Sequence, residues 1–107
     1  MGIEISKQDW ALFKEKVPVW QENNMAGLIQ SYVQLLQDEK MDASDRFWEL
    51  EKRINKDRRT PGVVIELHKD SMLWDLARFV SDGLVSEEEL AEFSEDVQDA
   101  VSLILRR

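Results

Sequence analysis

The sequence predicts an all-α fold, a compact bundle of about five helices forming one domain over residues 1–107. Apolar residues recur at helical spacing along almost the whole chain, and no alternating β-branched run of strand length stands free of that pattern. With 43% hydrophobic and 34% charged residues, the chain has enough apolar material for a core beneath a heavily charged surface.

The first two predicted helices lie on either side of Pro18. Ser6 followed by Asp9 is typical of a helix start, and the apolar residues after it predict a helix over residues 7–16. Pro18 suits a first helical turn or a kink. Beyond it, one broad apolar stripe predicts a second helix, formed by Met25, Leu28, Ile29, Tyr32, Val33, Leu35 and Leu36.

The third predicted helix follows a polar stretch in which Asp42 or Ser44 would be the cap. We expect Glu49 and Arg53 to pair at a spacing of four residues. A narrow apolar stripe is expected to face inward, and its residues are Phe47, Leu50 and Ile54. Trp48 flanks this stripe and would either close the edge of the core or join a contact surface.

Residues 58–62 can be interpreted either as a loop or as the cap and first turn of another helix. From Asp70 or Ser71 the helical pattern is firm again, with Gly83 placed as the terminator. The apolar face of this fourth helix comprises Met72, Leu73, Leu76, Phe79 and Val80.

A capping-box pattern, Ser86 followed by Glu89, begins the last predicted helix. Ser94 could cap a separate final helix. A heptad-like stripe continues to the end through Leu90, Phe93, Val97, Ala100 or Val101, and Ile104. A second copy could pair through that stripe to give a homodimer, although the same residues equally suit the protein's own core.

Composition excludes several classes of protein. The absence of cysteine excludes a disulfide scaffold, a zinc finger and a thiol nucleophile. No apolar run is long enough to span a membrane and the N-terminus lacks an export signal, so a cytoplasmic protein without membrane contact is expected. No nucleophile–base pair or ligand set is visible, so neither an enzyme nor a cofactor is predicted.

Two weak motifs have structural explanations. Residues 82–89 resemble the second half of a calcium loop, but Arg78 and Val80 occupy positions that must offer oxygen ligands. An extended backbone would also bring three polar side chains to one side of the chain, those of Glu66, His68 and Asp70. Because a lone histidine in a polar run is usually solvated, no metal or catalytic site is predicted there.

The acidic run over residues 87–99 gives the strongest functional indication, since it holds seven carboxylates and no Lys or Arg. Helix starts favour acidic residues, but seven exceed what capping requires. We therefore predict a non-enzymatic interaction or regulatory module that binds a protein partner, basic in charge, on an acidic C-terminal helical surface. The predicted partner-binding residues are Trp74, Glu88, Glu92, Glu95, Asp96 and Asp99.

Trp74 has two possible locations because it lies opposite the main apolar face of its helix. Burial on a second core face with Val63 and Leu67 is the expected location for a large aromatic residue. An exposed Trp74 would instead suit an interface anchor.

A DNA-binding regulator is the alternative function, because residues 73–107 resemble a helix-turn-helix unit. Residues 85–92 are similar to the first helix of many bacterial DNA-binding domains. The would-be recognition helix begins with Glu95, Asp96 and Asp99, which repel phosphates, and the net charge of −8 also disfavours nucleic acid. An acidic mimic of nucleic acid that inhibits an enzyme is the third candidate.

Several segments resemble small uncharacterised all-helical proteins of Gram-positive anaerobic bacteria. These segments are Phe47-Trp48-Glu49-Leu50-Glu51-Lys52-Arg53-Ile54, Pro61-Gly62-Val63, Asp82-Gly83-Leu84-Val85-Ser86 and Phe93-Ser94. The resemblance covers most of the chain. It implies a bacterial cytoplasmic origin and carries over neither an activity nor functional residues.

Overall fold

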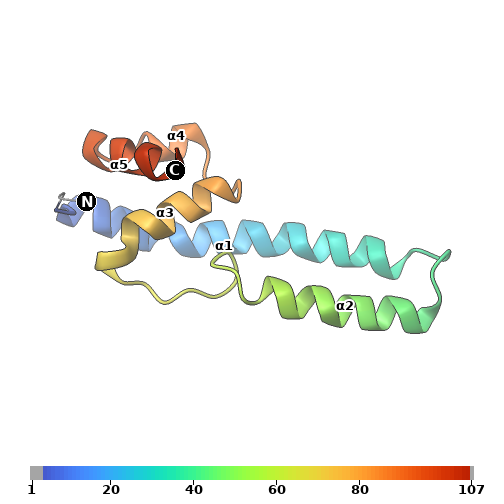
Figure 1. Ribbon diagram of the computed structural model, residues 1–107. Coiled ribbons are helices and arrows are strands. Elements are labelled where there is room, and N and C mark those ends of the chain that lie inside the picture. The colour runs from blue at the N-terminus through green and yellow to red at the C-terminus, as the bar shows by residue number, and fades with distance from the viewer. Residues whose placement is uncertain (1–3, 107) are drawn as a thin grey trace. The chain divides into compact units, whose positions relative to one another are not determined.

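The computed structural model describes residues 4–106. All regular secondary structure assigned within that range is helical (Figure 1). The elements are α1 (Lys7–Leu36), α2 (Ala43–Asp57), the short 3-10 helix η1 (Lys69–Ser71), α3 (Met72–Ser81), α4 (Glu87–Leu90) and α5 (Glu95–Leu105). The all-α prediction with about five helices is confirmed. None of the helices within residues 4–106 combines the length and the apolarity that crossing a bilayer requires.

The contacts divide the chain into two compact units. One, here the core unit, combines the chain up to Trp20 with the chain from Glu66 onward, and the other, here the hairpin, is Gln21–Ile65. Helix α1 contributes to both. The single-domain organisation of residues 1–107 stays a prediction.

Helix α1 continues through Pro18, so the predicted break between two helices is wrong. A proline inside a helix costs about 3 kcal/mol, because it removes one backbone hydrogen bond and crowds the preceding turn. One face of α1 carries three residues that are at most 1% exposed: Phe13 and Val17 before the proline and Trp20 after it. Burying each such side chain contributes about 1.5–3 kcal/mol, so packing outweighs the proline.

The core unit packs α3 against α5, with the first part of α1 completing an aromatic cluster. The ring centroid of Trp20 lies 5.5 Å from that of Phe79 and 6.2 Å from that of Phe13. The other buried apolar residues of this unit include Met72, Leu73, Leu76, Val85, Phe93, Val97, Ala100 and Val101.

The helix ends of this unit follow the sequence signals closely. Gly83 adopts a φ of 79° and ends α3, with its N–H donating to Val80 and the Leu84 N–H donating to Phe79. This pair of bonds is a Schellman motif. The capping box at Ser86 is confirmed, and Ser94 caps a separate α5 by accepting from the Val97 N–H.

The hairpin consists of the second part of α1 and α2, which run side by side in Figure 1. The Glu49–Arg53 pair is confirmed at 3.3 Å, and Asp42 is the N-cap residue of α2, although its side chain makes no capping bond. Residues 58–68 form turns followed by chain without regular secondary structure, so the loop interpretation is correct. Side chains of α1 hold this loop, because Gln21 donates to the Pro61 carbonyl and Asn24 to the Gly62 carbonyl, each at 3.0 Å.

Candidate functional site

The predicted acidic surface is exposed to solvent, although fewer of its carboxylates are unpaired than the sequence suggests. Glu88, Glu95, Asp96 and Asp99 are exposed, and none of them forms an ion pair with another described residue. Glu92 is exposed but lies 3.3 Å from Lys16 Nζ. The acidic run contains no cation of its own, but folding brings Lys16 from α1 to one of its seven carboxylates.

Glu89 is part of the scaffold, because its carboxylate makes two kinds of structural hydrogen bond. One oxygen accepts from the buried Trp20 Nε1 at 2.8 Å, and the other accepts from the Ser86 N–H at 3.2 Å. The Trp20 bond is the main cause that lowers the pKa of Glu89, and the Ser86 bonds and the charge of Lys16 add to it against the opposing effect of burial. Glu89 is therefore committed to holding α4 on α1.

Trp74 is 49% exposed on α3, so the favoured expectation of a core position is wrong. Helix α3 begins only at Met72, and residues 64–68 have no regular secondary structure. No helical second face therefore forms with Val63 and Leu67 to cover the indole. Trp74 lies on a different helix from the acidic residues that it was predicted to accompany.

The heptad-like stripe of residues 90–104 faces the core. Phe93, Val97, Ala100 and Val101 are all buried within the core unit. A homodimer formed through these four side chains would require the core to open. The alternative use of the stripe, packing within the protein itself, is the one the structure has.

The candidate helix-turn-helix unit has a very short first helix. Helix α4 comprises a single turn, Glu87–Leu90, and α5 starts with the exposed Glu95 and Asp96. A recognition helix presents its N-terminal residues to base edges and phosphates, where carboxylates are repelled.

An open apolar face on the hairpin is the feature that the sequence prediction missed. Phe47 was expected to face inward and is 63% exposed, and the neighbouring Trp48 is 62% exposed. Helix α2 has no buried residue at all, and within Gln21–Ile65 only Leu35 and Gly62 are buried. Other large apolar side chains of this unit are also exposed, namely Ile29, Val33, Leu36, Ile54 and Val64.

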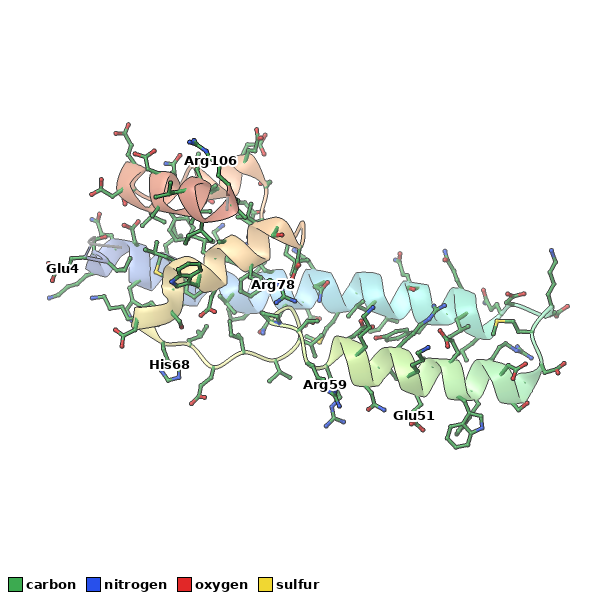
Figure 2. The ribbon with its side chains drawn as sticks, in the orientation of Figure 1. Glu4, Glu51, Arg59, His68, Arg78 and Arg106 are labelled. Carbon is green, nitrogen blue, oxygen red and sulfur yellow. The ribbon has the colours of Figure 1, made fainter. Side chains whose placement is uncertain are left out.

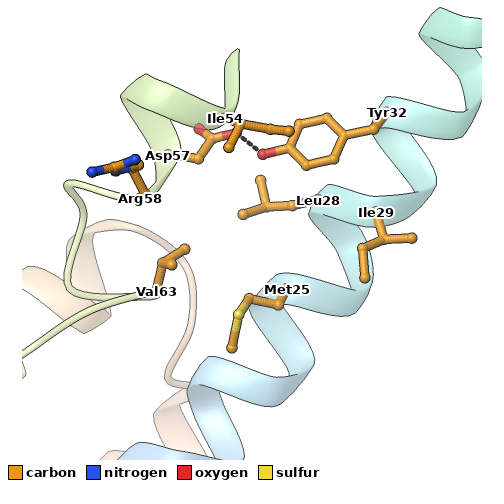
Figure 3. Close-up of a pocket in the computed structure, with 8 residues that line it drawn as sticks. All are labelled: Met25, Leu28, Ile29, Tyr32, Ile54, Asp57, Arg58 and Val63. Atoms are coloured by element: carbon orange, nitrogen blue, oxygen red, sulfur yellow. Dashed lines mark hydrogen bonds between the residues drawn. The ribbon is translucent and has the colours of Figure 1, made fainter. Parts of the chain in front are cut away.

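A cavity of about 340 Å³ opens between α1 and α2 on this face (Figure 3). Its lining residues are Met25, Leu28, Ile29, Tyr32, Ile54, Asp57, Arg58 and Val63. The Tyr32 hydroxyl donates a hydrogen bond to the Asp57 carboxylate at its edge. Burial and this carboxylate together raise the pKa of Tyr32 to about 12, so the hydroxyl is a fixed neutral donor that closes one side of the cavity.

A second hollow of about 250 Å³ continues along α2 and is lined by Phe47, Leu50, Glu51, Ile54 and Asn55. Ile54 borders both hollows, and the two hollows together are here called the hairpin groove. Ile29, Val33 and Leu36 follow each other at helical spacing and extend the apolar face along α1. The groove has the mostly apolar lining that binding sites share.

The sequence carried a signal for this face in the width of the α1 stripe. Seven apolar residues between Met25 and Leu36 exceed what one neighbouring helix can cover, and α2 offers only a narrow stripe in return. The apolar residues of α1 that α2 cannot cover are therefore exposed.

No three His, Asp or Glu side chains within residues 4–106 lie together as a metal site would need. His68 Nε2 lies 3.6 Å from Glu66 Oε1, but both side chains are exposed, and His68 projects from the loop before η1 (Figure 2). Asp70 lies within η1, so the extended chain expected over all three residues does not form. Comparison of the chain with protein-family models, curated proteins and solved structures finds no match.

Proposed function

We propose that this protein is a non-enzymatic interaction module that binds a protein partner through the hairpin groove. The observation that carries the proposal is the exposure of large apolar side chains on both helices of the hairpin, with Phe47 and Trp48 each more than 60% exposed. Large exposed apolar patches are rare on monomeric proteins and mark interaction sites where they occur. A partner that covered them would gain about 25 cal/mol per Å² of apolar surface removed from water.

The residue types in the groove also suit protein binding. Interface hot spots are enriched in aromatic residues and Arg, surrounded by contacts that exclude water. Phe47 lines the groove and stands edge to face with Trp48, with the ring centroids 5.0 Å apart, so the two form an exposed aromatic pair. Arg58 lines the cavity between α1 and α2, near the other end of the groove.

The proposal is tested by replacing two groove residues, Ile29→Gln and Phe47→Gln, and comparing partner capture with the wild type by quantitative mass spectrometry. A matched control replaces two apolar residues of similar exposure outside the hairpin, Val19→Gln and Leu103→Gln. We expect the groove variant to lose its partners, the control to retain them, and both to keep the helical circular dichroism of the wild type. Retention by both folded variants would contradict the proposal.

A second contact surface is proposed on the acidic C-terminal helices, for a partner of basic charge. Four exposed carboxylates without an ion pair in the described chain support it, those of Glu88, Glu95, Asp96 and Asp99. Their replacement by amides should abolish salt-sensitive capture of basic proteins. A control that neutralises four exposed carboxylates elsewhere removes the same charge, using Glu15, Glu22, Glu39 and Asp45.

If both neutralised variants lost capture of basic proteins equally, the binding would be an effect of net charge and the second surface would be contradicted. Direct binding of duplex DNA that weakens steeply with salt would instead favour the helix-turn-helix alternative. Competition with DNA on an enzyme, without duplex binding, would favour the nucleic-acid mimic.

A further inference from the structure

We infer that α2 is a strap that separates from α1 and unfolds at a much lower free energy than the core unit, so that the hairpin opens while the core unit stays folded. The inference concerns the free chain and goes beyond the proposed function, since it holds whatever the groove binds. Local opening of this kind is expected where a helix has few buried apolar contacts and a solvent-exposed surface.

The first observation is how little apolar surface α2 buries. None of its 15 residues is buried, whereas five of the ten residues of α3 are buried. Its inward apolar residues are only partly covered, because Ile54 is 42% exposed and Leu50 is half-buried. Packing of an apolar face supplies most of the stability of a helix in a protein, and an isolated helix of about 12–15 residues is marginal in water. Helix α2 therefore has little to keep it helical once it leaves α1.

Polar bonds near the two ends of α2 join it to α1. At its start, Arg46 donates through Nη1 to the Leu36 carbonyl at the end of α1. At its end, the Asp57 carboxylate accepts from the Tyr32 hydroxyl (Figure 3). None of the ion pairs within residues 4–106 joins the two helices, and the one pair that α2 forms there lies within the helix itself.

The closed form also leaves one polar atom of α2 unsatisfied. Arg46 Nε is buried and has no hydrogen-bond partner among the described residues. A buried donor without an acceptor loses its hydrogen bonds to water without compensation, so this contact opposes closure. Opening returns the guanidinium to water and relieves the penalty.

The chain on both sides of α2 suits this movement. Residues 37–42 and 58–63 are not helical, so the backbone there can change its dihedral angles without breaking a helix. Beyond α2, the loop is held by α1 itself, through the bonds from Gln21 to the Pro61 carbonyl and from Asn24 to the Gly62 carbonyl. Helix α2 is therefore tethered on both sides, and it can open without any change in the core unit.

Opening changes the apolar surface that the hairpin presents. In the closed form, residues of α1 and α2 together line the hairpin groove. In the open form, the covered side of α1 reaches the solvent, including Leu35, which is 5% exposed, and the half-buried Met25, Leu28 and Tyr32. The strap therefore decides whether the hairpin offers a groove between two helices or the apolar stripe of α1 alone.

Native-state hydrogen exchange of the wild-type chain, read residue by residue by NMR at increasing urea, tests the inference. We expect the amides of α2 to exchange at least about a hundredfold faster than the slowest amides of α3 and α5. Their exchange should also depend less steeply on urea, because local opening exposes less surface than global unfolding. Equal protection and equal urea dependence in α2, α3 and α5 would show one cooperative unit and would overturn the inference.

A variant tests the bond at the end of α2. Tyr32→Phe removes the donor to Asp57 and keeps the ring, so we expect α2 to exchange about tenfold faster, with α3 and α5 unchanged. The matched control, Arg78→Gln, removes an exposed bond of 2.9 Å to Asp82 at the end of α3 and should leave α2 unchanged. Equal acceleration of all three helices in Tyr32→Phe would mean that the hairpin and the core unit open together, and an unchanged rate in α2 would mean that opening does not break this bond. Either result would overturn the inference.

Discussion

Asp9 joins the starts of α1 and α5, and its replacement should destabilise the core unit more than any exposed carboxylate. The side chain is 5% exposed and accepts three hydrogen bonds. One comes from the Ser94 N–H at 2.9 Å, one from the Ser94 hydroxyl at 2.7 Å and one from the Ser6 hydroxyl at 2.9 Å. The carboxylate thus satisfies a backbone donor at the residue that caps α5.

The magnitude follows from those three bonds. A hydrogen bond to a charged group contributes about 1.5–3 kcal/mol, and the three share one carboxylate, so their contributions do not simply add. We expect Asp9→Ala to cost about 3–4 kcal/mol, because it leaves the Ser94 N–H unsatisfied. Asp9→Asn keeps an acceptor for that N–H and loses mainly the charge, so we expect about 1–2 kcal/mol.

The pH dependence of this contribution has a definite sign. Burial raises the pKa of Asp9, but the hydrogen bonds from Ser94 and Ser6 outweigh it, so the pKa of Asp9 in the folded protein lies below its ordinary value of 3.8. A lowered folded pKa means that the stabilisation is complete above the unfolded pKa and is lost as the pH falls through the folded one. Wild-type stability should therefore decrease below about pH 4, and Asp9→Asn should lack this component.

Urea unfolding followed by circular dichroism and tryptophan fluorescence measures both effects. The matched control is Asp96→Asn, which removes the same charge from an exposed site in the first turn of α5. That change loses only the interaction with the helix dipole, about 0.3–1 kcal/mol. Equal losses for Asp9→Asn and Asp96→Asn, or equal pH profiles for wild type and Asp9→Asn, would refute the reasoning.

Three further predictions concern other parts of the chain. Trp20→Phe removes the donor to Glu89, so urea titrations should show a loss of about 1–2 kcal/mol, and NMR titration should show a higher pKa for Glu89. Gly83→Ala puts a Cβ on a residue at φ 79° and should lower the free energy of unfolding by about 1–2 kcal/mol. Gly27→Ala within α1 meets open space and should raise the free energy of unfolding by about 1 kcal/mol. Shifts of the unfolding temperature in the same direction for both variants would contradict this pair of predictions. Tyr32 is the only tyrosine in the sequence, so the absorbance of tyrosinate should titrate near pH 12, and Asp57→Asn should move the midpoint towards 10.0.

Local signals in the sequence predicted the helix ends well. Gly83, the Ser86–Glu89 capping box and Ser94 each act on the backbone within a few residues, so residue type and spacing are enough to identify them. The bond between Asp9 and Ser94 spans 85 residues, and only the folded chain brings these two residues together. The Ser6–Asp9 pattern predicted a helix start but gave no sign of the second helix that the same carboxylate serves.

Pro18 and Trp74 were misjudged for a related reason. Propensity favours a helix break at Pro18, but the burial of Phe13, Val17 and Trp20 around it is a tertiary effect. Trp74 was expected inside because large aromatics are usually buried, yet only the single turn of η1 precedes α3, and residues 64–68 before it are not helical, so no second core face forms. Both cases depend on which segments meet, which a single sequence specifies only indirectly.

The acidic run and the apolar face of the hairpin differ in how well the sequence alone predicts their exposure in the folded chain. The acidic run is conspicuous in the sequence, but folding commits Glu89 to structure and pairs Glu92 with Lys16. The hairpin face is inconspicuous in the sequence, because its apolar residues have the same spacing as those of a buried helix face. The physical distinction is how much apolar surface the fold can cover: the core unit buries its stripes between α1, α3 and α5, whereas the hairpin has only two helices to cover its own. A stripe without a neighbour is thermodynamically costly in water, and this cost makes the hairpin, rather than the acidic helices, the primary contact surface in our proposal.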